Sequence, residues 1–258
     1  MILRDLHTHT TYCDGKNSPE EMVRAALDLN MKTLGFSVHG NTFFDGSYCI
    51  KKERIDEYKA EINALKEKYH DKIEILCGVE MDYFSNEVAA EDFDYSIGSV
   101  HYVKCDNGYF PVDSSVEIFK STVENCFDGD YIAYAESYFK NVADVINRTK
   151  ADIIGHFDLV SKFNEGNKFF DENDARYISA GFAAIDALVK TGKPFEINSG
   201  AISRGYKTTF YPSEIFLQRI AQKGGKVILS SDSHSVNTLF FKFEEAERMA
   251  RDMGLEIV

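Results

Sequence analysis

The chain contains 258 residues, of which 44% are hydrophobic, and carries a formal net charge of −13 at pH 7. Single α/β barrel domains commonly reach this length, so we expect one domain that spans residues 1–258. The negative charge repels phosphate backbones and disfavours a nucleic-acid partner. No apolar run approaches the roughly 20 residues of a membrane span and no signal segment opens the chain, which predicts a cytoplasmic protein without a membrane partner. The oligomeric state stays open.

Five cysteines are spread along the chain, at positions 13, 49, 77, 105 and 126. None belongs to a Cys-x-x-Cys pair, and their odd number argues against a complete disulfide framework. We therefore expect reduced thiols. Cys13, although it precedes Asp14, is expected to be a packing residue, because no spare histidine remains to activate it.

Short apolar runs alternate with segments of helical periodicity along the chain. This alternation predicts βα units and a parallel sheet. The first apolar run leads into His7-Thr8-His9, and side chains two apart on a strand point the same way, so both imidazoles can reach one metal ion. The seven predicted strands comprise residues 2–6, 33–38, 73–79, 95–100, 152–155, 194–198 and 226–231.

Helices are predicted between these strands. Residues 18–21, Ser-Pro-Glu-Glu, combine an N-cap serine, a proline at the first helical position and a glutamate that can close a capping box. Residues 55–69 repeat apolar side chains at intervals of three and four, which indicates one long helix. Residues 114–150 are predicted to be helical, with a break at Gly129. The other helices are expected around residues 178–188, 213–224 and 243–253, and the role of residues 255–258 stays open.

Six of the seven predicted strands end in His, Asp or Glu. In a closed barrel of parallel strands these ends lie on one face, where barrel enzymes build their sites. Six of the seven histidines occupy such ends, whereas His70 closes a charged helix. Histidines with only structural hydrogen bonds would follow no such rule, so the pattern predicts a metal centre. The candidate ligands are His7, His9, Asp14, His39, Glu80, His101, His156, Asp232 and His234.

The motifs that carry these residues are His7-Thr8-His9, Asp14-Gly15, Ser37-Val38-His39, Gly78-Val79-Glu80, Gly98-Ser99-Val100-His101, Gly155-His156-Phe157-Asp158 and Ser231-Asp232-Ser233-His234. Together they resemble the PHP family, named for polymerase and histidinol phosphatase, over nearly the whole chain. The likeness is greatest to its stand-alone histidinol-phosphate phosphatases and not to the domain fused to DNA polymerases. It implies a distorted (β/α)7 TIM-like barrel that holds three divalent ions, Mn, Fe or Zn.

The resemblance also implies which residues hold each ion, with Glu80 bridging two of them. The implied sets are His7, His9, Glu80 and Asp232 for one ion, Glu80, His101 and His156 for a second, and Asp14, His39 and His234 for a third. Three carboxylates and six neutral imidazoles around three divalent ions leave a formal charge of about +3, which attracts a phosphate dianion.

Paired divalent ions can lower the pKa of a bridging water and generate a hydroxide nucleophile, so hydrolysis of a phosphomonoester needs no protein nucleophile. The leaving alkoxide needs a proton or a Lewis acid, and Asp232, His234 and a metal-bound water are the open choices. The resemblance implies a small-molecule substrate, L-histidinol phosphate, and a role in histidine biosynthesis.

Phosphate oxygens that no metal holds favour an arginine, whose planar fork binds two oxygens at once. Arg204 lies in the loop after the sixth predicted strand and is our first candidate, with Lys162 and Lys207 as weaker ones. Asp113 and Asp158 are candidates to face the cationic end of the substrate.

Other functions remain open on sequence alone. The same site could serve a phosphotyrosine phosphatase or a small-nucleotide phosphoesterase, and only substrate tests separate these. An amidohydrolase also opens with His-x-His on its first strand, but it usually has a catalytic lysine or a single late aspartate in place of the Asp232-x-His234 pair. A regulatory metal-binding module would not require a complete ligand set.

Overall fold

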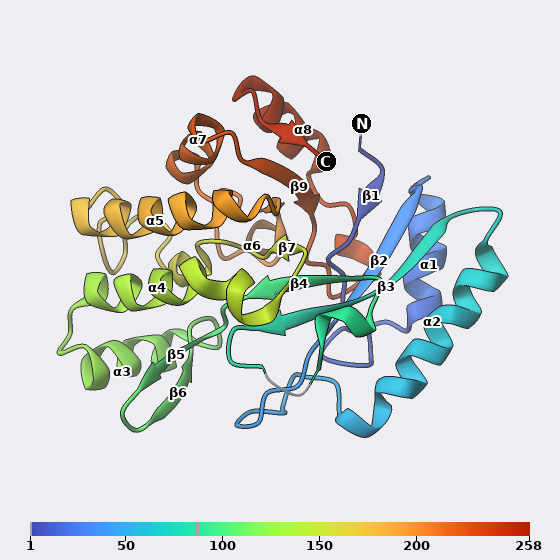
Figure 1. Cartoon of the computed structure of the whole chain (residues 1–258), viewed down its shortest axis with the longest axis horizontal. Helices are drawn as coiled ribbons and strands as arrows, with labels where there is room; N and C mark the ends of the chain where they lie inside the picture. The colour runs from blue at the N-terminus through green and yellow to red at the C-terminus, as the bar shows by residue number, and fades with distance from the viewer. Residues whose placement is uncertain (1, 86–87) are drawn as a thin grey trace.

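The computed structural model describes residues 2–85 and 88–258, and its strands follow the predicted order. The strands are β1 (Arg4–Asp5), β2 (Thr33–His39), β3 (Glu74–Asp82), β4 (Tyr95–Ser99), β5 (Tyr102–Cys105), β6 (Gly108–Pro111), β7 (Ile153–Ile154), β8 (Phe195–Asn198), β9 (Lys226–Ser230) and β10 (Glu256–Ile257). Eight of them form one parallel sheet of order β1-β2-β3-β4-β7-β8-β9-β10 (Figure 1). The sheet curls into the distorted TIM-like barrel that the sequence predicts.

Helices cover the outside of this sheet. In Figure 1 α1 and α2 lie on one side, α3, α4 and α5 on the other, and α7 and α8 near the two chain ends. The α-helices are α1 (Pro19–Asp28), α2 (Ile55–Tyr69), α3 (Val116–Cys126), α4 (Tyr131–Thr149), α5 (Ala175–Leu188), α6 (Gly200–Ser203), α7 (Glu214–Gln222) and α8 (Phe243–Asp252). Short 3-10 helices are η1 (Lys52–Arg54), η2 (Ala90–Asp92), η3 (Leu159–Ser161), η4 (Val189–Thr191) and η5 (Val236–Thr238).

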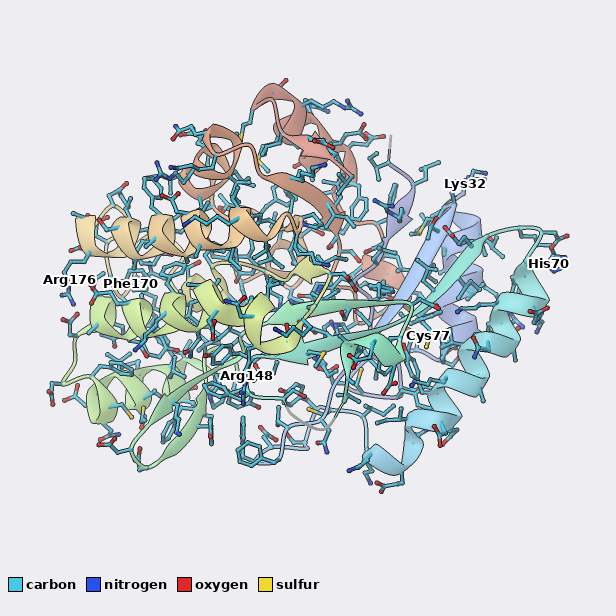
Figure 2. All side chains as sticks on the ribbon, in the orientation of Figure 1. Lys32, His70, Cys77, Arg148, Phe170 and Arg176 are labelled. Carbon is cyan, nitrogen blue, oxygen red and sulfur yellow. The ribbon has the colours of Figure 1, made fainter. Side chains whose placement is uncertain are left out.

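The helix caps and the helix break that the sequence predicts are present in the structure. Ser18 caps α1 with the expected capping box, since its backbone N–H donates to Glu21 Oε2 at 2.8 Å and its hydroxyl accepts from the Glu21 N–H. The helical stretch 114–150 is interrupted around Gly129, where α3 gives way to α4 and Asp130 caps the second helix. His70, expected at a charged helix end, is the exposed C-cap of α2, at the outer edge of the molecule (Figure 2).

Three features lie outside the sequence-based prediction. Residues 102–111 form the antiparallel hairpin β5–β6, which lies between β4 and α3. In the connection from β3 to β4, residues 83–85 and 88–94 include η2 and no α-helix. The unassigned C-terminal segment supplies β10, which pairs with β9 through Glu256 and Ile257. The β9–β10 pairing joins Lys226 to Glu256, a contact between distant segments that hydrophobic periodicity does not report.

Alternation along the strands sends successive side chains to the inner and outer faces of the barrel. The inner face is apolar near the amino ends of the strands and polar near their carboxyl ends. Because successive side chains point to opposite faces, Val79 packs outward in a helix-side core cluster while Gly78 and Glu80 point inward. Ser99 likewise follows Ile97 on the inner face of β4. The apolar inner cluster contains Leu6, Tyr95, Ile97, Ile153 and Ile228. Polar groups therefore collect beyond it, at the carboxyl ends of the strands.

Main-chain bonds join the first and last ligand-bearing segments. Thr8 and Ser233 form an isolated parallel bridge, in which the His9 N–H donates to Ser233 O at 2.8 Å and the Ser233 N–H donates to His7 O at 3.1 Å. This bridge brings the end of β1 next to the end of β9. None of the helices in the described part of the chain combines the length and apolarity needed to cross a lipid bilayer.

We predict that Gly78→Ala destabilises the protein. A Cβ at position 78 would lie 2.3 Å from Cζ of Tyr95, whose hydroxyl donates to Leu6 O at 2.5 Å, so the ring cannot yield without disturbing the first strand. Overpacking of this kind costs about 1–3 kcal/mol in the free energy of unfolding, measured by denaturant titration of the metal-free protein. Gly46→Ala is the matched control, since the nearest atom to its Cβ is 3.8 Å away. Equal effects of the two substitutions would contradict the prediction.

Candidate metal centre

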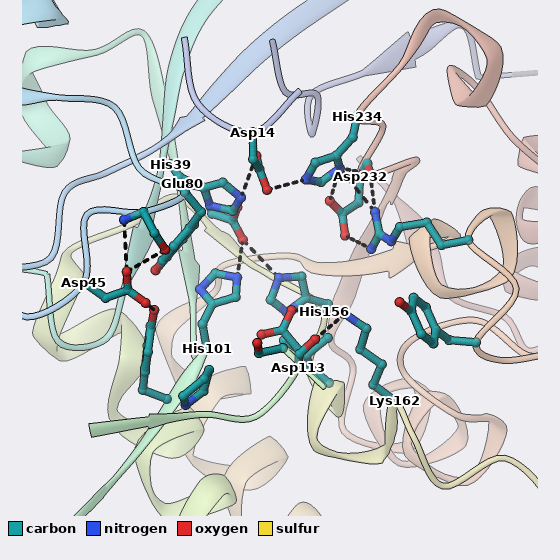
Figure 3. Close-up of a pocket in the computed structure, with 18 residues that line it drawn as sticks. Asp14, His39, Asp45, Glu80, His101, Asp113, His156, Lys162, Asp232 and His234 are labelled. Atoms are coloured by element: carbon teal, nitrogen blue, oxygen red, sulfur yellow. Dashed lines mark hydrogen bonds and ion pairs between the residues drawn. The ribbon is translucent and has the colours of Figure 1, made fainter. Parts of the chain in front are cut away.

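The nine sequence-predicted ligands converge at the carboxyl ends of the barrel strands. Figure 3 labels Asp14, His39, Glu80, His101, His156, Asp232 and His234 among them. Within each of four groups, the candidate ligand atoms all lie within 4.8 Å of one another. The groups are His9, Asp14, His39 and His234; His7, His156 and Asp232; His7, His9 and Glu80; and His39, Glu80 and His101. A cluster of imidazoles and carboxylates in this density suits divalent metal ions.

Glu80 lies at the centre of the cluster and is 1% exposed. Its Oε1 faces Nε2 of His101 at 3.3 Å and Nε2 of His156 at 3.0 Å. Its Oε2 faces Nε2 of His7 at 3.2 Å and Nδ1 of His39 at 2.9 Å. The two oxygens of one carboxylate therefore serve two different sets of histidines, which is the arrangement that a bridging ligand requires.

Asp14 marks the outer side of the cluster. Its Oδ1 lies 3.5 Å from Nε2 of His39 and its Oδ2 lies 3.3 Å from Nε2 of His234. The rings of His39 and His234 both stack on His9, with centroids 4.2 Å apart in each case. The Asp14 side chain is 37% exposed, so this part of the cluster is the one open to solvent.

The charges of the cluster depend on one another. Burial disfavours a charge on Glu80, but His7 and His39 outweigh it and hold the pKa of this carboxyl well below its usual range. Burial also opposes a charge on His7, yet the surrounding carboxylates raise its pKa well above the ordinary value. Burial, with His39 and His234, lowers the pKa of His9 to about 3. The carboxylates thus require nearby positive charge, which protons or divalent ions can supply.

Several buried atoms of the cluster have no hydrogen-bond partner. They include Nε2 of His7, Nε2 of His9 and Oε2 of Glu80. Unsatisfied polar atoms in a protein interior cost about 1–3 kcal/mol each, so a concentration of them calls for a specific explanation. Metal coordination supplies one, because these atoms are lone-pair donors that face the centre of the cluster.

A cavity of about 320 Å³ lies against the cluster. Arg204 and Lys162, two of the sequence-based candidates for the phosphate, both line it. Arg204 donates from Nη1 to Asp232 O at 2.8 Å and from Nη2 to Asp232 Oδ2 at 2.9 Å. Lys162 donates from Nζ to Asp113 O at 2.7 Å, and Asp113 also lines the cavity.

Two other predicted substrate residues, Lys207 and Asp158, lie elsewhere. Lys207 is buried and donates from Nζ to Glu172 Oε1 at 3.0 Å. Asp158 is fully buried, burial raises its pKa to about 6, and its Oδ2 accepts from the Ser213 N–H at 2.9 Å. Neither residue lines the cavity that adjoins the metal-ligand cluster, so the structure does not bring them together with Arg204 and Lys162.

Sequence reasoning missed three residues that border the site. Glu196 is a buried carboxylate of β8, with Oε1 2.6 Å from Nδ1 of His7. A charge at an alternate position of a short apolar strand was the signal that could have found it. Asp45 and Tyr48 line the cavity from a loop between β2 and α2, where no periodic pattern points to them.

Fold and site together define a class of protein: a barrel whose strand ends present a cluster of ligands for divalent metal ions. Residues 5–200 match the model of the PHP domain, so the chain belongs to the PHP family. The family resemblance drawn from the sequence motifs is thereby confirmed.

Individual relatives match over nearly their full lengths. A Deinococcus radiodurans protein named as a probable histidinol-phosphatase is 28% identical, with 98% of this chain and 94% of that protein covered. The histidinol-phosphatase of Bacillus subtilis is 24% identical, with 95% and 98% covered. A histidinol phosphate phosphatase from Lactococcus lactis, solved with Zn, L-histidinol and phosphate, superposes with a TM-score of 0.76 at 22% identity, covering 100% of this chain and 95% of that one. That superposition supports the fold.

We predict that His101→Asn and His156→Asn reduce the number of metal ions bound per chain, whereas His70→Asn does not. His101 and His156 both face Oε1 of Glu80, while His70 is an exposed helix cap. Elemental analysis after metal supplementation measures the bound ions. Ions that bind only the folded state stabilise it. Metal at about 100 times its dissociation constant should therefore raise the free energy of unfolding of His70→Asn by about 2.7 kcal/mol per site, as it does for the parent protein. Equal metal content in all three variants would contradict the ligand assignment.

Proposed function

We propose that this protein is a metal-dependent phosphomonoesterase that hydrolyses L-histidinol phosphate to L-histidinol and phosphate, a step of histidine biosynthesis. The observation that carries the proposal is the convergence of nine ligand-type side chains beside a cavity that Arg204 and Lys162 line. The names of full-length relatives support the substrate.

The metal centre of this proposal holds three divalent ions, Mn, Fe or Zn, in the sets that the family resemblance implies. The orientation of the two Glu80 oxygens toward different histidines and the separate outer group around Asp14 support the number three. Bound divalent ions would supply Lewis acidity and lower the pKa of water at the site.

Arg204 and Lys162 are assigned to the phosphate. A guanidinium forms charge-assisted hydrogen bonds to two oxygens at once, and an ammonium acts as a point charge. Lys162 is held in place by Asp113 and by the Tyr206 ring, whose centroid lies 4.7 Å from Nζ. In Figure 3 the lysine and its aspartate lie across the cavity from Asp14. Phosphate would therefore bind between these cations and the ligand cluster.

Asp45, Tyr48 and Tyr102 are assigned to the cationic end of the substrate. All three line the cavity. Asp45 accepts from the Tyr102 hydroxyl at 2.7 Å and from the Ser47 N–H at 2.9 Å, and both of these donors are neutral. Burial opposes its charge, but the Ser47 and Tyr102 hydrogen bonds outweigh it and lower the pKa of this carboxyl. An ionised carboxylate beside two aromatic rings favours an ammonium or imidazolium group.

Asp232 is assigned as a ligand and not as the proton donor to the leaving alcohol. Burial disfavours its charge, but Arg204 and His7 outweigh it and hold the pKa of the carboxyl well below its usual range. A carboxylate that stays ionised carries no proton to donate. We assign that proton to water in the cavity, because His234 belongs to the outer ligand group, where its imidazole must be neutral to hold an ion.

We predict that L-histidinol phosphate is the preferred substrate in a panel of phosphomonoesters assayed with Mn, Fe and Zn. The carboxylate of Asp45 attracts the cationic alcohol. By contrast, p-nitrophenyl phosphate and a nucleoside monophosphate carry no cation for it, and the ammonium of phosphotyrosine is accompanied by a carboxylate. Values of kcat/KM should exceed those for p-nitrophenyl phosphate, phosphotyrosine and a nucleoside monophosphate at least tenfold, which corresponds to about 1.4 kcal/mol.

Chelation is the control for this panel and should abolish turnover of every ester. Strong preference for phosphotyrosine or a nucleotide would overturn the histidinol assignment but keep the metallophosphatase chemistry. Hydrolysis of an amide or a cyclic imide, with no phosphatase activity, would overturn both and favour the amidohydrolase alternative.

We predict that Arg204→Ala lowers kcat/KM for histidinol phosphate by about 2–4 kcal/mol of transition-state stabilisation, roughly 30- to 1,000-fold. The loss combines the phosphate contact with the support that Arg204 gives Asp232. Steady-state kinetics at saturating metal measure it. Arg176→Ala is the control, since Arg176 pairs with Asp130 and Glu136 on the surface. A loss below tenfold would move the phosphate contact to Lys162.

A further inference from the structure

The strand β8 is the only one of the seven predicted barrel strands whose end offers no candidate ligand in the sequence. It instead places Glu196 on the inner face of the barrel, where the residue is 1% exposed. Glu196 does not belong to any of the four ligand groups found among residues 2–85 and 88–258. A buried carboxylate is costly to desolvate unless it is paired, so its partners indicate why it is there.

Those partners include two candidate metal ligands, His7 and His156. Oε1 of Glu196 lies 2.6 Å from Nδ1 of His7, and both side chains are 0% exposed. Oε2 accepts from the backbone N–H of His156 at 2.9 Å and from Nδ2 of Asn198 at 3.2 Å. One carboxylate therefore touches the side chain of one candidate ligand and the main chain of another.

The contact with His7 determines which nitrogen carries the proton. A carboxylate is an acceptor only, so Nδ1 of His7 is the donor in this bond. In a neutral imidazole the lone pair then resides on Nε2. That atom points into the cluster, 3.2 Å from Glu80 Oε2 and 3.7 Å from Asp232 Oδ1. The tautomer and the ring orientation are those that a metal ligand needs.

The second contact of Glu196 holds the main chain of His156, whose side chain faces the other oxygen of Glu80. His156 follows β7, and its Nε2 lies 3.0 Å from Oε1 of Glu80, on the opposite oxygen from His7. Glu196 thus connects histidines that address both oxygens of Glu80. Ser99 also donates to Glu80 Oε1, at 2.6 Å, which fixes the carboxylate between them.

We propose that Glu196 is a positioning residue of the metal centre, which orients His7 through Nδ1 and anchors the main chain of His156, and thereby sets the affinity for divalent metal. This inference rests on the proposed function only in that the cluster binds metal. Glu196 belongs to none of the ligand groups among the described residues and does not line the cavity, so it would act on bound metal through His7 and His156.

The test is the isosteric variant Glu196→Gln. A glutamine has one acceptor oxygen, so it cannot accept from both His7 Nδ1 and the His156 N–H, and its amide N–H₂ must face one of these donors. Loss of such an outer carboxylate typically costs about 10- to 100-fold in metal affinity. Competition between the metal-free protein and a chromophoric chelator, with Zn and with Mn, measures that affinity without any turnover.

Glu172→Gln is the matched control. Glu172 also accepts two side-chain donors, Asn164 Nδ2 and Lys207 Nζ, each at 3.0 Å, but away from the cluster. The Glu172→Gln variant should keep the metal affinity of the parent protein. A structural role for Glu196 would instead lower the melting temperature of the metal-free protein and leave its metal affinity unchanged, and that result would overturn the proposal.

A double-mutant cycle separates action through His7 from a general effect. If Glu196 acts through His7, the Glu196→Gln loss should shrink in a His7→Asn background; full additivity would overturn that part of the proposal. Glu196→Asp serves where the glutamine variant does not fold, since it keeps the charge but withdraws it from Nδ1, and it too should lose at least about tenfold in affinity. Should the parent protein bind metal but not hydrolyse histidinol phosphate, the proposed function would fail while the affinity comparison still decides the role of Glu196.

Discussion

The carboxylate of Glu80 is the constraint on which the rest of the site depends. A charge that is fully removed from water is unfavourable by several kcal/mol unless opposite charge and hydrogen bonds surround it. Glu80 meets this requirement with Ser99 and with imidazoles from β2 and from the segments after β1, β4 and β7. Since the same imidazoles must be neutral to ligate metal, divalent ions and protons compete for one buried carboxylate.

This arrangement is possible because side chains alternate along each barrel strand, so that every second residue points into the barrel. Inward positions are filled by apolar side chains toward the amino ends and by ligands toward the carboxyl ends, so the step from Gly78 to Glu80 on β3 crosses from one layer to the other. Tyr95 marks the boundary, because its ring occupies the space left by Gly35 and Gly78 while its hydroxyl reaches Leu6 O. The apolar layer therefore also supports the strand that carries the first two histidines.

Much of this could be predicted from the sequence, because strand ends and helix caps are local signals. His7, His101 and His156 could be assigned to one face without any tertiary information, since parallel strands share a direction. The rest depends on contacts between distant segments. Lys207 was expected at the substrate but is bound by Glu172, 35 residues away, and Glu196 acquires its role only when β8 lies beside the first strand's histidine.

Asp232 shows how closely ligation and barrel closure are linked. Its φ of 52° lies in the left-handed region, which costs a non-glycine residue about 1–3 kcal/mol. Arg204 offsets this strain by binding both its carbonyl and its carboxylate, and the next residue, Ser233, bonds to His7 O across the closure. The Arg204 guanidinium holds Asp232 in place and also lines the cavity, so one side chain links the closure of the barrel to the cavity. In the proposed function, phosphate bound to Arg204 would share it with Asp232, so substrate capture and ligand geometry would be connected through one side chain.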